Sequence, residues 1–418
     1  MLVAPAPPAC WDRDVSLRDV LRSLPADPRV VLSGNHAVPF HLLGLVDEAL
    51  DHYRLWVLNA PPGLPDRDGV VYETPFVGAG MRRSPRLRYV PCRLSLVPSL
   101  FRTTAAPDLV VLHATRPRDG KVSLGVEVNV LPAAIEAARA RGAKVIAQVN
   151  DRMPWTFGDA ELDVDDLDLL VEADEPMVTL PAPAIDDIAS RIGALVASRV
   201  GDGATLQAGI GAIPDAALCG LTGRRGLRIW SEMFSDSVLV LERAGALDAE
   251  AAVRASFLFG SAELLDWADR NPRLHMIRTE TANDPALISR NPAMTSVNTA
   301  MQVDLFGQAN ASRVRTEIYS GFGGQTDFIV GALHSRGGQA LIALRSWHPR
   351  ADVSTIIPVV EGPVTSFQMT AVVTEQGVAE VFGLDQHRQA ANIIDHAAHP
   401  SARARLRKEA ASLGFVNV

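Results

Sequence analysis

A six-residue loop is written twice in this chain of 418 residues, once in each half. Gly34-Asn-His-Ala-Val-Pro39 and Gly209-Ile-Gly-Ala-Ile-Pro214 share glycine, alanine and proline at the same three positions. Each copy follows a short apolar run typical of a buried strand and precedes a run typical of a helix. We expect the glycine where the strand turns out and the proline at the first helical position. The repeat therefore predicts two related α/β halves, and chance recurrence in a chain rich in glycine and proline is the alternative.

The change of half is expected at the proline-rich Leu180-Pro-Ala-Pro-Ala184, which is typical of a linker. This predicts an N-terminal α/β domain over residues 1–183 and a C-terminal α/β domain over residues 184–418. Continuous apolar runs indicate strands of a parallel sheet, buried on both faces. Strands are predicted at Arg29–Ser33, Leu109–His113, Lys144–Val149 and Ala204–Gln207, and helices at Asp14–Leu24, Phe40–Leu50, Ala133–Arg141 and Ile185–Val200.

Composition and charge exclude several classes of protein. A net charge of -8 argues against a general nucleic-acid binder. Cys10, Cys92 and Cys219 have no CxxC spacing, so neither a disulfide framework nor a metal cluster is expected, and a reducing cytoplasm is the natural setting. The segment from Met1 to Trp11 lacks the pattern of a signal peptide, and no apolar run is long enough to predict a membrane span.

Glu232 is predicted to lie at the carboxyl end of a strand, where α/β folds bind their ligands. Leu227 to Trp230 alternate like a short strand, and Val238 to Ala244, stopped by Gly245, is typical of a helix. Glu232 lies between these two elements. Because ligands of open α/β sheets bind outside the carboxyl ends of strands, Glu232 is expected to meet the substrate. We predict that Glu232 is a nucleophile, and Glu375 is its rival, with a structural or lining role expected for Glu375.

Two further motifs can bind negative charge. Tyr319-Ser-Gly-Phe-Gly-Gly-Gln-Thr-Asp-Phe328 has three glycines in four positions between two strand-like runs. Glycine lets backbone amides converge on an oxyanion or a phosphate, and a plain hairpin is the alternative. The arginines Arg82, Arg83, Arg86 and Arg88 can hold ligand phosphates or form a solvated face.

The glycines Gly209 and Gly211 also allow a dinucleotide-binding interpretation. They would then hold a pyrophosphate, and Glu232, about twenty residues further on, would bind a ribose hydroxyl. Pro214 stands where that fingerprint needs its third glycine, which counts against this interpretation. The helix that begins near Pro214 can still receive a phosphate or a developing negative charge.

Six ordered motifs together resemble the acetyl-CoA hydrolase/transferase family. They are Gly209-Ile-Gly-Ala-Ile-Pro-Asp215, Glu232-Met-Phe-Ser-Asp236, Ser256-Phe-Leu-Phe-Gly-Ser261, Ser296-Val-Asn-Thr-Ala300 with Val303-Asp-Leu-Phe-Gly-Gln308, Ser320-Gly-Phe-Gly-Gly-Gln-Thr-Asp-Phe328 and Val373-Thr-Glu-Gln-Gly-Val-Ala379. Gln148–Pro154 and Val164–Asp168 extend the resemblance into the first half. It implies two open-sheet α/β domains of the CoA-transferase type, a homodimer, acyl-CoA or coenzyme A as a substrate, and no metal or tightly bound cofactor.

The resemblance also implies a role for each site residue. Glu232 attacks the thioester of an acyl-CoA to form a mixed anhydride, and the released thiolate then forms a glutamyl-CoA thioester. The amides of Gly323 and Gly324 stabilise the oxyanion, worth about 3 to 4 kcal/mol per donor, and Gln325 positions the carbonyl. The residues expected to face the CoA portion or the thioester are Gly209, Gly211, Pro214 and Gly321.

Several positions depart from the family's pattern. Trp230 stands where a histidine is usual, Ser237 where a glycine is common, and Gln376 where a tyrosine is usual. Ser366 to Thr370 replaces a polar segment that can orient acyl groups. These departures indicate an altered substrate rather than an inactive protein.

Three functions stay open. CoA transfer between carboxylic acids comes first, with an acyl-CoA and a carboxylate as small-molecule partners and with neither nucleic acid nor membrane. Hydrolysis of acyl-CoA through the same covalent intermediate is the first alternative. A non-catalytic CoA- or nucleotide-binding protein, or an NAD-dependent dehydrogenase, is the second.

Overall fold

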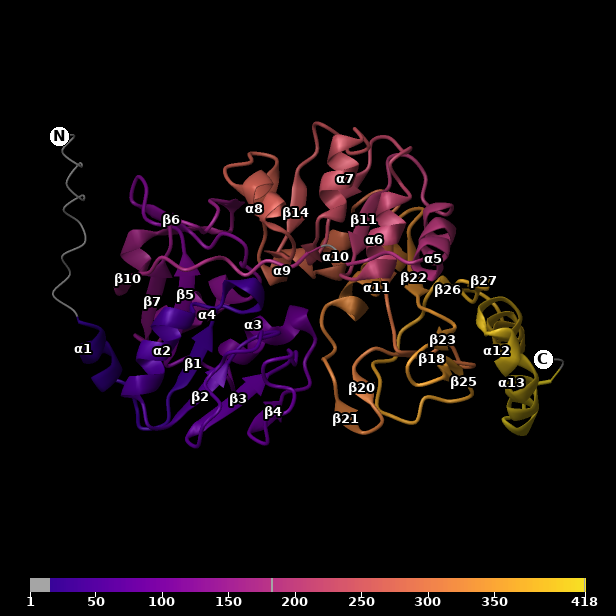
Figure 1. Ribbon diagram of the computed structural model, residues 1–418, viewed down its shortest axis with the longest axis horizontal. Helices are drawn as coiled ribbons and strands as arrows, with labels where there is room; N and C mark the ends of the chain where they lie inside the picture. The colour runs from indigo at the N-terminus through magenta and orange to yellow at the C-terminus, as the bar shows by residue number, and fades with distance from the viewer. Residues whose placement is uncertain (1–15, 182, 417) are drawn as a thin grey trace.

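The computed structural model describes residues 16–181, 183–416 and 418. The segment from Met1 to Trp11, Cys10 within it, and Asp14, the predicted start of the first helix, lie outside these residues. Figure 1 shows two α/β lobes side by side, with the N-terminal elements in indigo and purple and the C-terminal elements in orange and yellow.

The first half is built on a seven-stranded sheet in which all neighbouring strands are parallel. The strand order is β10-β7-β5-β1-β2-β3-β4. From β1 the chain adds β2, β3 and β4 on one side, and it then returns to add β5, β7 and β10 on the other side. The topological switch point therefore lies between β1 and β5. The strands are β1 (Arg29–Leu32), β2 (Tyr53–Trp56), β3 (Val70–Thr74), β4 (Leu87–Tyr89), β5 (Leu109–Ala114), β7 (Lys144–Val149) and β10 (Leu169–Glu172).

The second half repeats this plan on a six-stranded sheet of order β12-β11-β17-β22-β26-β27, parallel except for the last pair. Its switch point lies between β11 and β17. The prediction of two related open-sheet α/β domains is therefore confirmed. The strands are β11 (Thr205–Ala208), β12 (Arg228–Ile229), β17 (Thr295–Asn298), β22 (Gln339–Ala343), β26 (Ala371–Thr374) and β27 (Gly377–Glu380).

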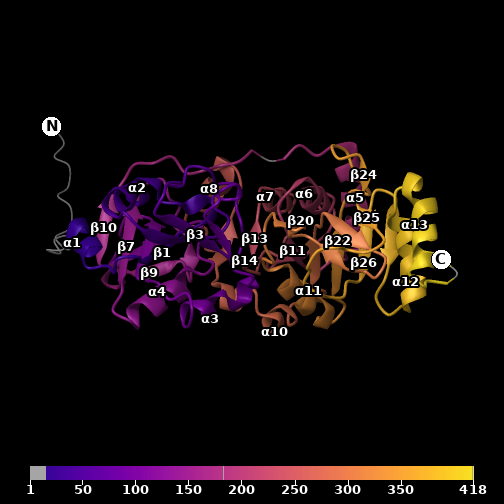
Figure 2. The ribbon, with the colours of Figure 1, turned by 90° about the horizontal axis from the view of Figure 1, so that it is seen from below.

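Helices cover both faces of each sheet. Figure 2 shows α2 and α4 on opposite sides of the first sheet and α6 and α11 on opposite sides of the second. Along β1, Val30 packs in the core beneath α2, and Val31 packs in the core that contains α4. The helices are α1 (Leu17–Arg22), α2 (Phe40–Ala49), α3 (Val97–Phe101), α4 (Leu131–Arg139), α5 (Asp187–Ala197), α6 (Ala212–Cys219), α7 (Ser237–Arg243), α8 (Ala262–Ala268), α9 (Thr279–Ala282), α10 (Pro285–Ile288), α11 (Gln325–His334), α12 (Gln386–Asn392) and α13 (Pro400–Ser412).

Short strands join the two halves. β14 and β16 of the second half form a sheet with β8 of the first, and Phe76 pairs with Gly321 as an isolated bridge. The division into residues 1–183 and 184–418 stays a prediction. The remaining strands are β6 (Lys121–Ser123), β8 (Phe157–Gly158), β9 (Glu161–Asp163), β13 (Met233–Phe234), β14 (Val253–Ala255), β15 (Phe257–Leu258), β16 (Leu274–Met276), β18 (Gln302–Asp304), β19 (Ala309–Asn310), β20 (Arg313–Val314), β21 (Glu317–Ile318), β23 (Trp347–His348), β24 (Val353–Ser354) and β25 (Ile356–Ile357).

The predicted place of the two prolines was wrong. Pro39 precedes α2 as its N-cap, and Pro214 is the third residue of α6 rather than the first. The first amides of a helix have no acceptor within the helix, so a proline at the third position removes no hydrogen bond. The motif therefore marks the start of a helix without marking its first residue.

The predicted strand after the glycine-rich loop was also wrong. The loop leads into α11, a helix of ten residues with Gly324 as its N-cap. An apolar run of this length is compatible with either element, and here tertiary packing decides between them.

Three further structural findings concern the described residues alone. Cys92 and Cys219 are both free thiols there. No helix in that part of the chain combines the length and apolar character needed to cross a membrane. No His, Cys, Asp and Glu side chains gather there in a group of three or more that could hold a metal ion.

Candidate active site

A cavity of about 400 Å³ lies between the two halves, at the carboxyl ends of their central strands. Its walls come from segments that follow β1, β2, β3 and β4 in the first half, and from the ends of β11 and β17 and the segments after β11, β12 and β17 in the second. The loop before α11 completes it. The lining residues are Asn35, Leu58, Asn59, Phe76, Leu94, Asn129, Gln207, Ala208, Gly209, Ile210, Glu232, Met233, Phe257, Asn298, Thr299, Ala311, Tyr319, Ser320, Gly321, Phe322, Gly323, Gly324, Gln325 and Phe328.

Glu232 lies in this cavity, partly buried between β12 and β13. The Nδ2 atom of Asn283 donates a hydrogen bond of 2.9 Å to Glu232 Oε2. The backbone carbonyl of Glu232 accepts from the amides of Ser256 and Phe257 at 2.8 and 3.1 Å. Burial raises the pKa of Glu232 to about 7, the hydrogen bond from Asn283 opposes this rise, and the charge of Asp327 adds to it. The carboxylate is therefore held in one place and poorly solvated, as a nucleophile requires.

The glycine-rich loop presses directly against this carboxylate. A Cβ atom at Gly324 would overlap both the Glu232 carboxylate and the Asn283 amide, so a side chain has no room there. Gly323 has a φ of 55°, in the left-handed region that favours glycine. Among the described residues, no acceptor takes the backbone N–H of Gly323 or Gly324. The arrangement places glycine backbone next to Glu232 with amides free to bind a ligand oxygen.

Residues of the first half hold this loop in place. The amide of Leu94 donates to the carbonyl of Gly323 at 3.0 Å, and Ser95 Oγ donates to Asp327 Oδ1 at 2.9 Å. Arg82 donates through Nε to the carbonyl of Tyr319 at 2.8 Å and stacks on its ring. Burial raises the pKa of Asp327 to about 6, while hydrogen bonds from Ser95 oppose the rise. At least one arginine of the predicted cluster thus supports the cavity from outside.

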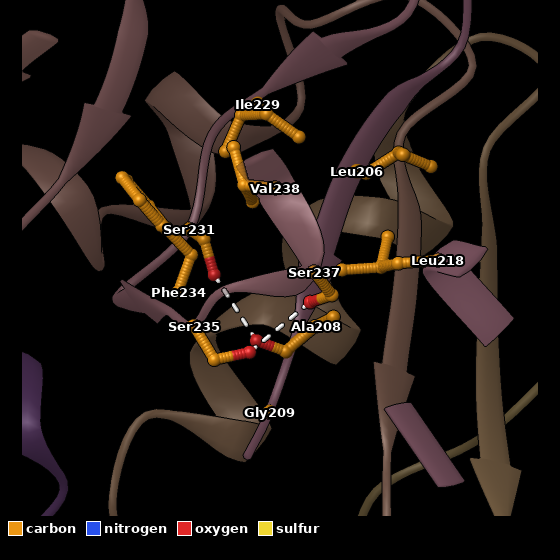
Figure 3. Close-up of a pocket in the computed structure, with 10 residues that line it drawn as sticks. All are labelled: Leu206, Ala208, Gly209, Leu218, Ile229, Ser231, Phe234, Ser235, Ser237 and Val238. Carbon is orange, nitrogen blue, oxygen red and sulfur yellow. Dashed lines mark hydrogen bonds between the residues drawn. The ribbon is translucent and has the colours of Figure 1, made fainter. Parts of the chain in front are cut away.

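Hydrogen bonds hold the residues that follow Glu232 against their neighbours. Ser235 Oγ donates to Asp215 Oδ1 of α6 at 2.6 Å, and Asp236 accepts the amide of Ser261 at 3.0 Å. A small cavity of about 10 Å³ lies beside these residues. Figure 3 shows the side chains that line it, among them Ser231, whose Oγ donates to the carbonyl of Ala208 at 3.3 Å. This space is too small for a substrate and belongs to the packing that supports Glu232.

Six of the eight predicted site residues line the cavity. They are Glu232, Gly323, Gly324, Gln325, Gly209 and Gly321. Gly211 is the N-cap of α6, and Pro214 is buried inside that helix, so neither is among the lining residues. The Gln325 side chain donates to the carbonyl of Thr299 at 3.3 Å.

Sequence reasoning missed a second carboxylate near Glu232. Glu127, 1% exposed, accepts from Asn35 Nδ2 at 2.8 Å, and its backbone pairs with Phe257, whose amide donates to Glu232. Burial raises the pKa of Glu127 to about 8, the Asn35 hydrogen bond opposes this, and the charge of Glu232 adds to it. Asn283 was missed as well. Neither residue belongs to a recognisable motif, because each reaches the site through tertiary contacts alone.

Two residues noted in the sequence have clear contacts. Trp230 donates through Nε1 to the carbonyl of Ala282 at 3.0 Å, immediately before Asn283. Glu375 is not among the lining residues of the cavity, and its carboxylate accepts from the amide of Ser346 at 3.0 Å and from Gln376 at 3.2 Å. Burial acts to raise the pKa of Glu375, but hydrogen bonds, above all the one from the Ser346 hydroxyl, leave it below its usual value. Its contacts are those of a structural residue.

Comparison with protein families finds two matches along this chain. Residues 67–181 match the acetyl-CoA hydrolase/transferase N-terminal domain, and residues 260–410 match the C-terminal domain of the same family. The 4-hydroxybutyrate coenzyme A transferase of Clostridium kluyveri is 38% identical over 80% of this chain and 80% of its own length. An acetyl-CoA hydrolase of Neurospora crassa is 28% identical over 70% of this chain and 63% of its own length.

Solved structures share the fold over nearly the whole chain. The 4-hydroxybutyrate CoA-transferase of Porphyromonas gingivalis, 30% identical, superimposes with a TM-score of 0.79 and covers 94% of this chain and 96% of its own. RipA of Yersinia pestis, 26% identical, gives 0.89 and covers 96% and 97%. The chain therefore belongs to the acetyl-CoA hydrolase/transferase family and is an enzyme of the CoA-transferase type.

Proposed function

We propose that this protein moves CoA from an acyl-CoA donor to a carboxylic acid acceptor, with Glu232 as the nucleophile. The observation that carries the proposal is the contact between Gly324 and the Glu232 carboxylate inside the cavity. That contact brings a poorly solvated nucleophile next to backbone amides without another acceptor.

The first half-reaction transfers CoA to the enzyme. A Glu232 oxygen attacks the thioester carbonyl, giving an oxyanion that the amides of Gly323 and Gly324 stabilise, while Gln325 positions the carbonyl. The carbon–sulfur bond breaks, and CoA leaves as a thiolate from the acyl-glutamyl anhydride. The thiolate then attacks the glutamyl carbonyl, the donor acid leaves as a carboxylate, and a glutamyl-CoA thioester remains.

The acceptor carboxylate repeats these steps in reverse order and leaves with CoA. Each step exchanges one carboxylate or thiolate for another, so no proton has to move. The described lining residues suit this chemistry, because none of them is a lysine, arginine or histidine that would serve as a general acid.

We propose that CoA enters past Gly209 and Gly321, with α6 and its residues Gly211 and Pro214 behind the thioester. A neighbouring groove of about 370 Å³ shares Thr299 with the cavity and supports this path. Its lining includes Trp347, on which an adenine can stack, and Arg345, His348 and Arg350, which can face phosphates.

Mass spectrometry of the intact enzyme tests the mechanism. Incubation with an acyl-CoA should add a mass equal to CoA less water. Borohydride added after the acyl-CoA reduces the glutamyl-CoA thioester and should therefore inactivate the enzyme irreversibly. The Glu232→Gln variant should show no adduct. An adduct of full size on that variant would exclude Glu232 as the nucleophile.

Hydrolysis of acyl-CoA is the alternative that the Neurospora crassa relative favours. Water would then take the acceptor's place at the same glutamyl-CoA thioester. Measuring CoA release with and without a carboxylate acceptor separates the two functions. Release at the same rate in both conditions would support the hydrolase.

We also propose that the enzyme works as a homodimer in the cytoplasm. The family resemblance supports the dimer, and the scattered cysteines support a reducing compartment. Light scattering of the purified protein would give its mass, and a monomer at micromolar concentration would contradict the dimer.

A further inference from the structure

A second cavity, of about 510 Å³, lies between the two halves, and we call it the α8 groove. Among the described residues, it shares no lining residue with the cavity that holds Glu232. Residues that follow β5, β7 and β10 line it from the first half, and one face of α8 lines it from the second. The volume suits a small molecule, and ligands of α/β sheets bind outside the carboxyl ends of the strands. The groove is therefore a candidate for a second binding site.

The charges of the α8 groove are balanced and mostly paired. Three arginines and three aspartates line it. Arg116 forms ion pairs with Asp151 at 3.1 Å and with Glu172 at 3.4 Å. Arg152 forms an ion pair with Asp174 at 2.6 Å. The groove thus has no excess of positive charge, which disfavours a phosphorylated ligand such as a nucleotide or CoA.

Two charged side chains of the α8 groove have no ionic partner among the described residues. They are Arg118, from the first half, and Asp266, from α8. The guanidinium of Arg118 lies 6.0 Å from the centre of the Trp155 ring. The amide of Trp155 donates to Asp269 Oδ1 at 2.7 Å, and Asp269 lies on the same side of α8 as Asp266, one turn further on. Trp155 therefore connects the unpaired cation of one half to the helix that carries the unpaired carboxylate of the other.

Apolar side chains complete the α8 groove. Trp155 is 8% exposed and Met153 is 4% exposed, and Met153 belongs to the hydrophobic core. Leu265 and Met177 line the groove as well and pack against that core. An apolar group of a ligand can pack on this surface, because an aromatic ring offers a large contact area and thioether side chains adapt their shape.

We propose that the α8 groove binds a free α-amino acid with a large apolar side chain. The carboxylate of the ligand pairs with Arg118, its ammonium group pairs with Asp266, and its side chain packs on Trp155. Each charge of the ligand then exchanges its hydration for a partner of opposite charge. Because the ligand contacts residues of both halves, its binding stabilises the folded protein. The inference goes beyond the proposed CoA transfer, which does not use this groove.

Calorimetric titration with L-leucine, L-methionine and L-phenylalanine tests the binding. At least one of them should bind with a Kd of about 1 mM or below. The N-acetyl derivative and the amide of the best ligand each keep one of its two charges. Both should bind at least about tenfold more weakly, as expected when one charge-assisted hydrogen bond is lost. No binding of any of the three amino acids at about 10 mM would overturn the inference, as would equal binding of the two derivatives.

Variants then assign the two charges of the ligand to residues. Arg118 and Asp266 are both exposed, so Arg118→Gln and Asp266→Asn should keep the fold, and each should weaken binding about tenfold. Arg118→Gln should also bind the amide as well as the amino acid, and Asp266→Asn should bind the N-acetyl derivative as well as the amino acid.

Arg152→Gln is the matched control for these variants. Arg152 lines the same groove but already pairs with Asp174, so its loss should change the Kd of the amino acid less than about twofold. An unchanged Kd in Arg118→Gln or in Asp266→Asn would overturn the proposed contacts, and so would an equal loss in Arg152→Gln.

CoA transfer, measured in the same variants, separates this inference from the proposed function. Neither Arg118 nor Asp266 lines the cavity of Glu232, so both variants should transfer CoA at the wild-type rate when no amino acid is present. Amino-acid binding by an enzyme that forms no glutamyl-CoA adduct would support the groove and contradict the proposed function. An adduct on an enzyme that binds no amino acid would do the reverse.

Discussion

The two halves of the molecule place corresponding residues against the same cavity, but the side chains at these positions differ in charge. β12 ends at Ile229 and Glu232 follows three residues later, and β2 ends at Trp56 and Asn59 follows three residues later. Both side chains line the cavity, and in each half the strand lies one position away from the switch point. A carboxylate stands in one half and a neutral amide in the other. Since a second carboxylate in the same cavity would raise the pKa of Glu232 further, a neutral amide at Asn59 favours the ionised form of Glu232.

The repeated loops differ in a related way. In the first half Asn35 is 2% exposed and lies in a short 3-10 helix against the cavity wall. In the second half Ile210 is 42% exposed at the rim, although it also lines the cavity. The loop in the first half therefore forms a closed wall of the cavity, whereas the loop in the second half lies at its open rim, where we propose that CoA enters. The repeated fold thus provides two equivalent strand ends, and the residues at each end determine whether its loop is closed or open.

The largest effect should come from the carboxylate itself. Glu232→Gln should lower kcat by about 10⁴-fold or more, because the nearly isosteric amide is not a nucleophile. The melting temperature should change little. Asn59→Glu in the same background should not restore activity, since Asn283 and Gly324 contact the carboxylate at position 232. Recovery in the double variant would show that the two halves are interchangeable.

The second-largest loss of activity is expected from a variant that fills the space beside the Glu232 carboxylate. Gly324→Ala puts a Cβ atom onto the Glu232 carboxylate and should lower kcat/KM by about 10²- to 10³-fold, the range seen when an oxyanion donor is displaced. Gly44→Ala is the matched control in α2, where a Cβ atom meets nothing within 4 Å. Steady-state kinetics would compare kcat/KM of the two variants. Equal values would contradict a role of the glycine-rich loop in catalysis.

The pH profile should report the environment of Glu232. Only the ionised carboxylate attacks, so kcat/KM should fall as the pH drops below about 7, the pKa to which burial raises Glu232. Asn283→Ala removes a hydrogen bond to the charged form and should move this acid limb to higher pH. Asp327→Asn removes a like charge and should move it lower. An acid limb near pH 4.5 in the wild type would contradict the buried environment.

The smallest effect should come from the support behind Asn283. Trp230→Phe loses the hydrogen bond to the Ala282 carbonyl and should cost about 1 kcal/mol of unfolding free energy, with a few-fold loss of activity. Denaturant unfolding gives the first quantity and initial rates give the second. A loss as large as that of Gly324→Ala would mean that Trp230 touches the substrate.

The sequence by itself predicted the two α/β halves, the parallel strands and the place of Glu232 at a strand end. These features follow from local periodicity and from a loop motif, both of which act over a few neighbouring residues. Local signals also had limits, because the run after Gly324 was predicted as a strand and is the helix α11. A short apolar run satisfies both elements until its neighbours are known.

Only the tertiary structure decided what surrounds the nucleophile. Asn283 reaches Glu232 across 51 residues of sequence, and Asn35 reaches Glu127 across 92. The raised pKa of each carboxyl group comes from burial between the two halves, a property of the assembled cavity that no short segment carries. The sequence therefore predicted the reacting residue, and packing determined the environment of its carboxylate and which backbone amides lie beside it.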